Sequence, residues 1–475
     1  MPGFELSRFV CRFAEGGPML SSSRSLLAAP LQVRRLAALA ALAVLAGLPG
    51  RARADDDNAA APAKDETFAI HAQSTLIDQA VTDFRSPYVG QNSLRPSQGR
   101  ETFTATLYAG FRPWRGGELW IDPEIDQGFG LSDTEGVAGF PNGQGAKVGK
   151  VVPYLRLQRM FFRQTIDLGG ESQKVDPDQN QLGGSHTANR LVFWVGKLSV
   201  VDIFDTNKYA HDAANDFLNW SVVDAGSFDY AADAWGYTYG TALEWYQGRW
   251  TLRAGAFDLS DVPNGSLIDP TFGQDQYVGE LEERHTIAGQ DGRVMLTGFL
   301  TRGRMGTFAD AIQLSQATGQ PPSTAAVRRY RSRTGVSLDL EQSLSDDLGF
   351  FVRAGVADGN VEPYEYADID QTVSGGLSLS GKRWGRKDDT VGVAGVVNTI
   401  SKIHQRYLAD GGLGILVGDG KLPHPGPEEI LETYYKIGLT ANTALSFDAQ
   451  LVGNPAYNRD RGPAPIFAAR LHAQF

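Results

Sequence analysis

The chain has 475 residues, a net charge of −11 at pH 7 and a single cysteine, Cys11. Its acidic balance argues against a nucleic-acid partner, because such proteins present a basic footprint. One cysteine near the N-terminus supplies neither a disulfide framework nor a cysteine metal site.

The N-terminus has the pattern of a secretory signal. Arg34-Arg35 precede an apolar run at 36–48, and the small-residue site Ala52-Arg53-Ala54 follows. The run is too short to cross a bilayer as a helix. We therefore expect residues 1–54 to be a signal peptide, with Met19 as an alternative translation start; the competing interpretation is an N-terminal anchor helix.

Residues 55–67 are rich in Ala, Asp and Lys without any period, so they are expected to form a disordered leader. From residue 68 onward, apolar and polar residues alternate in short segments, which is typical of strands with two different faces. The clearest segments are 102–112, 336–341, 373–380, 431–440, 445–451 and 467–475. Further segments are 68–73, 117–122, 153–159, 190–199, 236–247, 249–257, 293–302, 348–357 and 390–399. The predicted fold of 68–475 is all-β, a single transmembrane antiparallel β-barrel of about 16 strands.

Turn signals divide the strands into hairpins. Short turns are expected at Gly248, 345–347 and 441–443, and we place them on the periplasmic side. Segment 307–318 is expected to form a short helix that ends at Gly319. The long segments are expected to be extracellular or folded into the lumen, with 125–150 the first candidate to fold inward. They are 125–150, 202–235, 258–290, 358–370 and 400–428.

Aromatic residues gather near the expected strand ends, where a barrel carries its interfacial girdle. The alternative is that they are ordinary core aromatics. The set is Trp114, Trp120, Trp194, Tyr237, Tyr239, Trp245, Tyr246, Trp250, Tyr434 and Tyr435.

No pattern points to catalysis or to a cofactor. The seven histidines are scattered, and the sequence has neither a His-Glu-x-x-His zinc motif nor a Gly-x-Ser-x-Gly elbow. Asp122 and Glu124 lie two residues apart, but a glycosidase needs two carboxylates across a cleft, which proximity in sequence does not establish. We expect no enzyme activity, no cofactor and no metal.

The most informative segment is 112–124, in which charged and aromatic residues interleave at a strand end. Such a lining suits a neutral polyhydroxylated ligand, because rings stack on sugars while Arg and carboxylates replace the hydration of hydroxyl groups. Each candidate can equally be part of a structural ion pair in the barrel wall. The candidate eyelet residues are Arg112, Trp114, Arg115, Glu118, Trp120, Asp122 and Glu124, with Arg156, Arg190, Arg253 and Arg353 from other strands.

The chain resembles the carbohydrate-selective porins, the OprB-like family. The run Arg115-Gly116-Gly117-Glu118-Leu119-Trp120-Ile121-Asp122-Pro123-Glu124 carries the resemblance, together with Gly139-Phe140-Pro141-Asn142-Gly143 and Asn454-Pro455-Ala456-Tyr457-Asn458. The resemblance covers about 68–475. It implies a 16-stranded barrel in a Gram-negative outer membrane and facilitated diffusion of small carbohydrates through a narrow eyelet. The long presequence departs from the family pattern.

The function expected from these features is a passive porin for glucose-like monosaccharides or small oligosaccharides. Two alternatives stay open, namely a general or ion-biased diffusion pore and a secreted soluble protein that binds or cleaves polysaccharide. The expected partners are small sugars, outer-membrane lipid and lipopolysaccharide, and the barrel assembly machinery, which would recognise the terminal strand ending in Phe475. Both a monomer and a homotrimer are compatible with the sequence.

Overall fold

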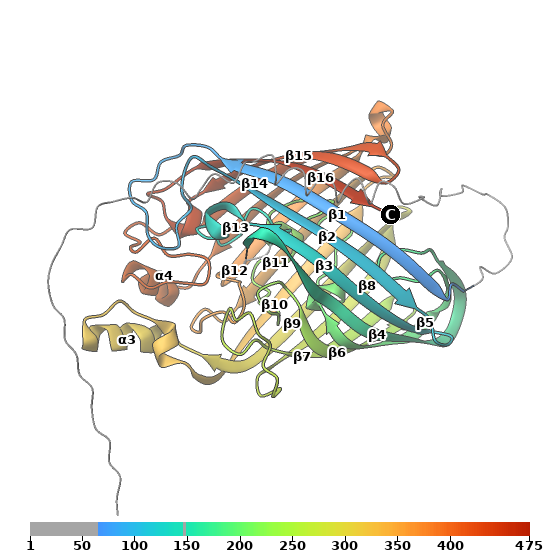
Figure 1. Ribbon diagram of the computed structural model, residues 1–475, viewed down its shortest axis with the longest axis horizontal. Coiled ribbons are helices and arrows are strands. Elements are labelled where there is room, and N and C mark those ends of the chain that lie inside the picture. Colours follow the sequence, from blue (N-terminus) through green and yellow to red (C-terminus); the bar gives the residue numbers. More distant parts are fainter. Residues whose placement is uncertain (1–64, 146–148) are drawn as a thin grey trace, which may run out of the picture.

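The described residues, 65–145 and 149–475 of a computed structural model, form a closed antiparallel barrel of 16 strands. Each strand pairs with its neighbours in sequence, and the first strand closes on the last (Figure 1). The strands are β1 (Phe68–Val81), β2 (Gln98–Phe111), β3 (Gly117–Gly128), β4 (Lys150–Val175), β5 (Gly184–Leu198), β6 (Thr238–Gln247), β7 (Trp250–Asp258), β8 (Asp275–Ile287), β9 (Gln290–Met305), β10 (Arg329–Ser343), β11 (Leu348–Ala357), β12 (Gln371–Ser380), β13 (Thr390–Thr399), β14 (Glu428–Thr440), β15 (Thr443–Gly453) and β16 (Ala464–Gln474).

The alternation in the sequence matches the two faces of the barrel wall. On β3, Leu119, Ile121 and Ile125 are exposed on the outer face, whereas Glu118 and Asp126 are buried on the inner face. An apolar outer face and a polar inner face are what a membrane barrel requires. The predicted β-barrel is therefore confirmed, and the exposed apolar outer face argues against the soluble β-protein alternative.

One predicted loop is wrong. Segment 258–290 was expected to lack a strand, yet it contains β8. Glu280 and Glu282 of β8 face inward, while Glu283 and His285 face outward near the end of the strand. Because both faces carry charge, the alternation of hydrophobic and polar residues is lost and the strand escapes detection.

The connections differ in length at the two ends of the barrel. Short turns join β6 to β7 and β14 to β15, as predicted, and these turns lie at the end that also holds Phe475 (Figure 1). We call this the short-turn end and the opposite one the long-loop end. The predicted helix is present at the long-loop end as α3 (Phe308–Thr318), where Thr307 caps its N-terminus and Gly319 ends it with φ of 69°. Two further α-helices lie in loops, α2 (Trp220–Val223) and α4 (Lys402–Ala409).

The predicted aromatic girdle is present only in part. Trp114, Tyr239, Trp245 and Trp250 are exposed at strand ends, as interfacial aromatics are. Trp120, Trp194 and Tyr434 are instead buried, so they belong to the inside of the molecule.

The predicted signal peptide at 1–54, and most of the leader at 55–67, lie outside the described residues. Within the described ranges, no helix has the length and apolar character needed to cross a membrane.

Candidate functional site

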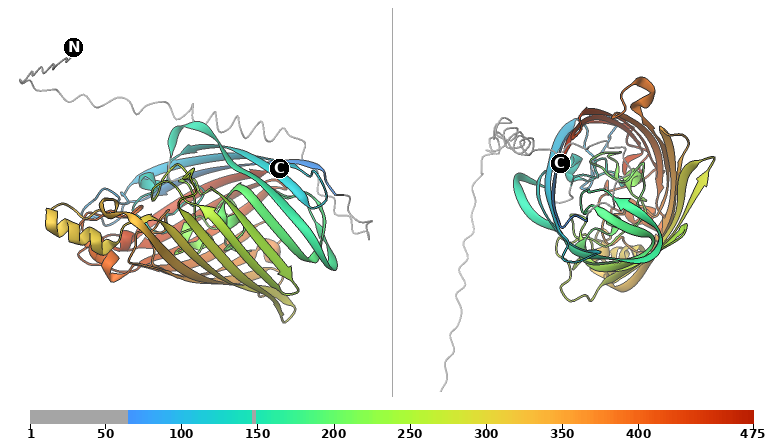
Figure 2. Two further views of the ribbon diagram at one scale, coloured as in Figure 1. Left: turned by 90° about the horizontal axis from the view of Figure 1, so that it is seen from below. Right: turned by 90° about the vertical axis from the view of Figure 1, so that its right-hand side faces the viewer.

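Two long loops fold into the barrel and narrow its lumen. The first, 199–237, joins β5 to β6, and the second, 129–149, joins β3 to β4. The right-hand view of Figure 2 looks along the barrel and shows chain segments inside the ring of strands. The ring of Phe140 from the second loop stacks on Trp220 from the first, with centroids 5.4 Å apart.

Buried charges on the wall hold the first loop. The guanidinium of Arg353 is fully buried and donates to the carbonyl oxygens of Ala210, Val222 and Val223. Glu432 on β14 accepts hydrogen bonds from the backbone N–H groups of Leu218 and Asn219. Buried carbonyl and N–H groups need such partners, so these wall residues fix the path of the loop.

The second loop is held in the same way. Glu428 on β14 accepts hydrogen bonds from the N–H groups of Ala138 and Gly139, and Gln79 and Gln450 both donate to the carbonyl oxygen of Pro141. Within 125–150, the first candidate to fold inward, residues 125–128 and 150 belong to β3 and β4, whereas the described loop residues 129–145 lie in the lumen beside the loop 199–237.

Two adjoining cavities remain between these loops and the wall. The central cavity has a volume of about 530 Å³ and is lined by both inward loops with β3 and β4. The short-turn cavity has a volume of about 760 Å³ and is lined by residues of β3 to β7 and β9, with the turn between β4 and β5 and the start of the first inward loop. Arg163, Gln181, Trp194 and Asp202 line both cavities, so the cavities meet there.

A β-bulge decides which arginines of β4 face the lumen. The pairing between β3 and β4 shifts between Asp122–Arg159 and Pro123–Leu157, which leaves Gln158 as an extra residue. Arg156 faces the lumen, so strict alternation along β4 would place Arg159 and Arg163 on the lipid face. The extra residue reverses the alternation, and both side chains face the lumen instead. Pro123 cannot donate a ladder hydrogen bond, and this is the sequence signal for the bulge.

Four arginines stack on aromatic rings along this side of the lumen. Their guanidinium carbons lie 3.4 to 4.9 Å from the ring centroids, which is cation–π geometry. The pairs are Arg156 with Trp235, Arg159 with Tyr237, Arg163 with Trp194 and Arg190 with Tyr246. The rings of Trp194, Trp235 and Tyr237 line the central cavity.

Carboxylates fix most of these arginines in place. Arg159 makes a two-pronged contact with Asp202, at 2.7 and 2.8 Å. Arg156 donates to Asp233 at 3.0 Å and Arg163 to Glu118 at 2.6 Å. A guanidinium held by both a carboxylate and a ring keeps one orientation, with its remaining N–H groups free for further hydrogen bonds.

The two cavities differ in charge. The central cavity is lined by Glu124, Asp126, Asp202, Asp212 and Asp224 but by only two arginines, Arg159 and Arg163. The short-turn cavity is lined by six arginines, Arg112, Arg115, Arg163, Arg190, Arg253 and Arg293, and by five carboxylates, those of Asp65, Glu118, Asp167, Asp202 and Glu244. A solute that moves through both cavities therefore passes from an acidic lining to a more basic one.

A turn folds across the lumen at the short-turn end. Residues 176–183 join β4 to β5, and Leu182 donates its N–H to Glu118 at 3.3 Å. Arg112 donates to the carbonyl oxygens of Leu182 and Gly183. Gln181 of this turn lines both cavities, so the turn forms part of their boundary.

The structure places the predicted eyelet residues in four kinds of position. Six line a cavity: Arg112, Arg115, Glu118, Arg190, Arg253 and Glu124. Arg156 lies behind Trp235, whereas Trp120, Asp122 and Arg353 are fully buried in the wall. Trp114 lies on the outer face, where it donates to Gln164 at 2.7 Å and packs on Phe162.

Sequence reasoning missed several lining residues, namely Arg159, Arg163, Trp194, Asp202 and the pair Trp235 and Tyr237. Trp194 shares its parity with Arg190 on β5, so strand alternation was sufficient to find it. The loop residues Asp202, Trp235 and Tyr237 enter the lumen through contacts distant in sequence and leave no local pattern.

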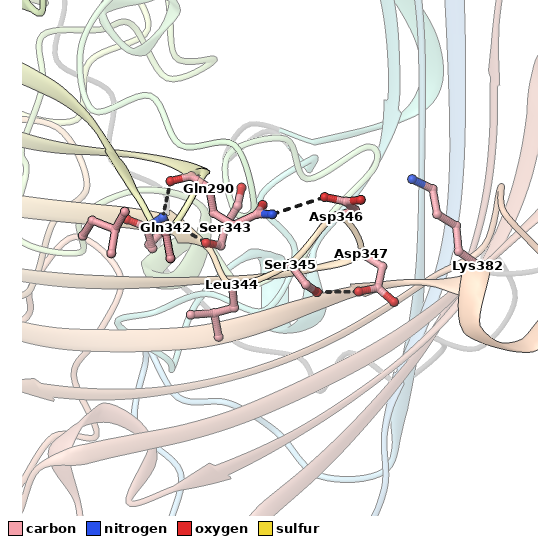
Figure 3. Close-up of a pocket in the computed structure, with 10 residues that line it drawn as sticks. Gln290, Gln342, Ser343, Leu344, Ser345, Asp346, Asp347 and Lys382 are labelled. Carbon is pink, nitrogen blue, oxygen red and sulfur yellow. Dashed lines mark hydrogen bonds between the residues drawn. The ribbon is translucent and has the colours of Figure 1, made fainter.

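A separate hollow of about 620 Å³ lies among the short turns (Figure 3) and shares no lining residue with either cavity. Its side chains bind one another, with Gln290 donating to Asp346 and Ser345 to Asp347. A hydrogen bond from Arg383 lowers the pKa of Asp347 to about 2, so this carboxylate stays ionised and paired. Over 65–145 and 149–475, no group of three or more His, Cys, Asp or Glu side chains is arranged to hold a metal ion.

Comparison with known proteins gives a consistent result. A family model described as carbohydrate-selective porin, OprB family, matches residues 91–475. The high-pH structure of Pseudomonas putida OprB is similar, with a TM-score of 0.64 and 14% identity over 86% of this chain and 94% of that one. The crystal structure of Acinetobacter baumannii OccAB1 has a TM-score of 0.46 and 10% identity, over 86% of this chain and 96% of that one. Among curated proteins, none matches the chain. At such identities the structural likeness shows the fold alone.

Proposed function

Because this chain belongs to the OprB family of carbohydrate-selective porins, we propose that it carries glucose-like monosaccharides and small oligosaccharides across the outer membrane by facilitated diffusion. As a porin of this family it is a transport channel of the Gram-negative outer membrane and not an enzyme. Movement is downhill and needs no cofactor. We place the short turns in the periplasm and the long loops at the cell surface.

One observation carries the proposed substrate class: the ring and guanidinium pairs that line the central cavity. The rings of Trp194, Trp235 and Tyr237 offer apolar faces, while Arg159 and Asp202 beside them offer fixed donors and acceptors. A sugar has both kinds of surface, with C–H faces and a rim of hydroxyl groups. Side chains held by ion pairs can replace the water around those hydroxyls without large rearrangement, and contacts of this strength also permit release.

The test is the flux of glucose into proteoliposomes, compared with that of an uncharged polyol of similar size. We expect glucose entry to be faster and to saturate with concentration, because the solute occupies a site on its way through. Equal, non-saturating rates for both solutes would leave only a general diffusion pore and would overturn the proposal.

A second function, an ion-biased pore, is supported by the acidic lining of the central cavity. Glu124 and Asp126 lie on β3, and neither makes an ion pair within 4.0 Å in the part of the chain that the structure describes. Such carboxylates favour cations over anions. This preference is compatible with sugar transport, since a neutral sugar is not affected by it.

We also propose two contacts outside the lumen and two candidate oligomeric states. The assembly machinery recognises the terminal strand that ends in Phe475, and lipopolysaccharide surrounds the long-loop end of the outer face. The barrel acts either as a monomer or as a homotrimer, and cross-linking in native membranes distinguishes the two states.

A further inference from the structure

Two arginines stand on the outer face of β9 directly above its apolar belt. Leu296 and Leu300 face outward in the middle of the strand, and Arg302 and Arg304 follow on the same face at the long-loop end. Both arginines are exposed. Their partners on β10 are Ser332 and Tyr330. A position just beyond the belt corresponds to the level of lipid headgroups.

Neither arginine is neutralised by an ion pair. Across 65–145 and 149–475, no carboxylate lies within 4.0 Å of the side chain of Arg302 or Arg304, and Arg302 lies 5.8 Å from the ring of Tyr330. Asp275 pairs with Arg302 in the strand register, but its carboxylate accepts a hydrogen bond from the hydroxyl of Tyr277. One acid beside two arginines leaves an excess of positive charge.

The neighbouring loop does not remove this excess. Arg329 and Arg331, at the start of β10, both bind the single carboxylate of Asp310 on α3. Elsewhere on the long-loop rim, outward charges include the acids Asp78 and Glu429, which repel anions. The positive charge is therefore local to β9 and β10.

We propose that Arg302 and Arg304 bind the phosphate groups of lipopolysaccharide in the outer leaflet. A guanidinium offers a planar fork of N–H donors that matches two phosphate oxygens. Arg302 and Arg304 lie two residues apart on one face of the strand, so their Cα atoms are roughly 7 Å from each other. Their two guanidinium groups can therefore bind one headgroup at two points. The hydroxyls of Tyr330 and Ser332 add donors at the same level. This inference names the residues for the proposed lipid contact and rests on placing the long loops at the cell surface.

The test is binding of two probes to the purified barrel in non-ionic detergent. One probe is deep-rough lipopolysaccharide, and the other is the same lipid after chemical removal of its phosphates. We expect wild type to bind the phosphorylated lipid more tightly. The double variant Arg302→Gln/Arg304→Gln should bind it roughly 30-fold more weakly, at about fivefold per basic residue near an anionic surface. The dephosphorylated lipid should bind both proteins equally.

The matched control removes the same number of charges from α4 at the same end, in Lys402→Gln/Arg406→Gln, and should bind lipopolysaccharide like wild type. Unchanged binding by the β9 variant would overturn the inference, as would equal affinity for the two lipids. Glucose entry into proteoliposomes, measured with the same β9 variant, separates this result from the proposed transport. If entry still saturates while lipid binding is unaffected, the lipid inference alone fails.

Discussion

Arg353 on β11 donates from Nε to the carboxylate of Asp339 on β10 across 2.8 Å, and both side chains are buried. The same guanidinium also lies 3.5 Å from the carboxylate of Asp205 and donates to the carbonyl oxygens of the loop 199–237. One arginine thus fixes the inward loop to the wall. Arg353 does not itself line either cavity, so its part in transport is to position the loop that does.

Arg353→Met is expected to lower the free energy of unfolding by about 3–5 kcal/mol, because it leaves the buried carboxylates of Asp339 and Asp205 without compensation. Chemical unfolding in detergent, followed by tryptophan fluorescence, measures the loss. Proteolysis within 199–237 should also become faster. The control is Arg383→Met, which removes an exposed arginine paired with Asp347 and should cost less than about 1 kcal/mol. Equal stability of the two variants would show that Arg353 does not anchor the loop.

Glu118→Ala is expected to increase sugar flux. Its carboxylate binds Arg112, Arg163 and the N–H of Leu182, so its loss releases the turn 176–183 from the short-turn mouth. Arg249→Ala is the matched control, because Arg249 lies in the short turn between β6 and β7, is exposed, pairs with Glu283 and lines neither cavity. We expect its flux to change less than twofold. Proteoliposome swelling checks both variants, and equal flux in Glu118→Ala and wild type would contradict the role of this carboxylate.

Most of the wall was predictable because alternation is a local signal. Leu119, Ile121 and Ile125 face lipid as the sequence indicates. The signal fails where a strand carries charge on both faces, as in β8, or where one extra residue reverses the parity, as Gln158 does in β4. Both failures occur at positions where the lumen is charged, and that charge is what the channel uses.

The path of the inward loops could not be predicted from the sequence, for a different reason. Arg353 meets Ala210 and Val222 across more than 130 residues of sequence, and Glu432 meets Leu218 across 214. No local period encodes such contacts. The sequence correctly predicts a polar lumen, but it does not indicate that Trp235 and Asp202 enter it, since these residues belong to a long loop whose path is set by contacts distant in sequence.

Deletion of Phe475 is expected to reduce the amount of folded protein in the outer membrane. Phe475 and Ala72 exchange two backbone hydrogen bonds, of 2.8 and 3.0 Å, at the seam where β16 meets β1. Its loss removes these hydrogen bonds at the end of the barrel seam. It also removes the aromatic terminus that we propose the assembly machinery recognises. Heat-modifiable migration of outer-membrane fractions measures the effect. Phe467→Ala, on the exposed face of the same strand, should assemble normally, and equal loss in both variants would argue against a specific role of the terminus.

Glu124→Gln/Asp126→Asn is expected to move the reversal potential in a salt gradient toward anions, because it removes two carboxylates from the lining of the central cavity. Glucose flux should change less than ion selectivity, since the sugar carries no charge. Asp83→Asn/Asp410→Asn is the control, because it removes two exposed acids from the long loops. An unchanged reversal potential in the double lumen variant would show that these acids do not face the path of the ions.

Trp235→Ala is expected to raise the glucose concentration for half-maximal flux about fivefold, because it removes a stacking contact with the sugar. Stacking of nucleic-acid bases on aromatic rings is worth on the order of 1 kcal/mol or more, and we expect a similar value for a sugar, which corresponds to about fivefold in affinity. The ring lines the central cavity, is held by Arg156 at 3.4 Å and donates from its indole N–H to Tyr154. Trp114→Ala removes an equal ring from the outer face and should leave the half-saturation unchanged. Concentration-dependent glucose uptake measures both. The pair distinguishes stacking in the lumen from a general effect of losing tryptophan, because only the first depends on which face of the wall carries the ring.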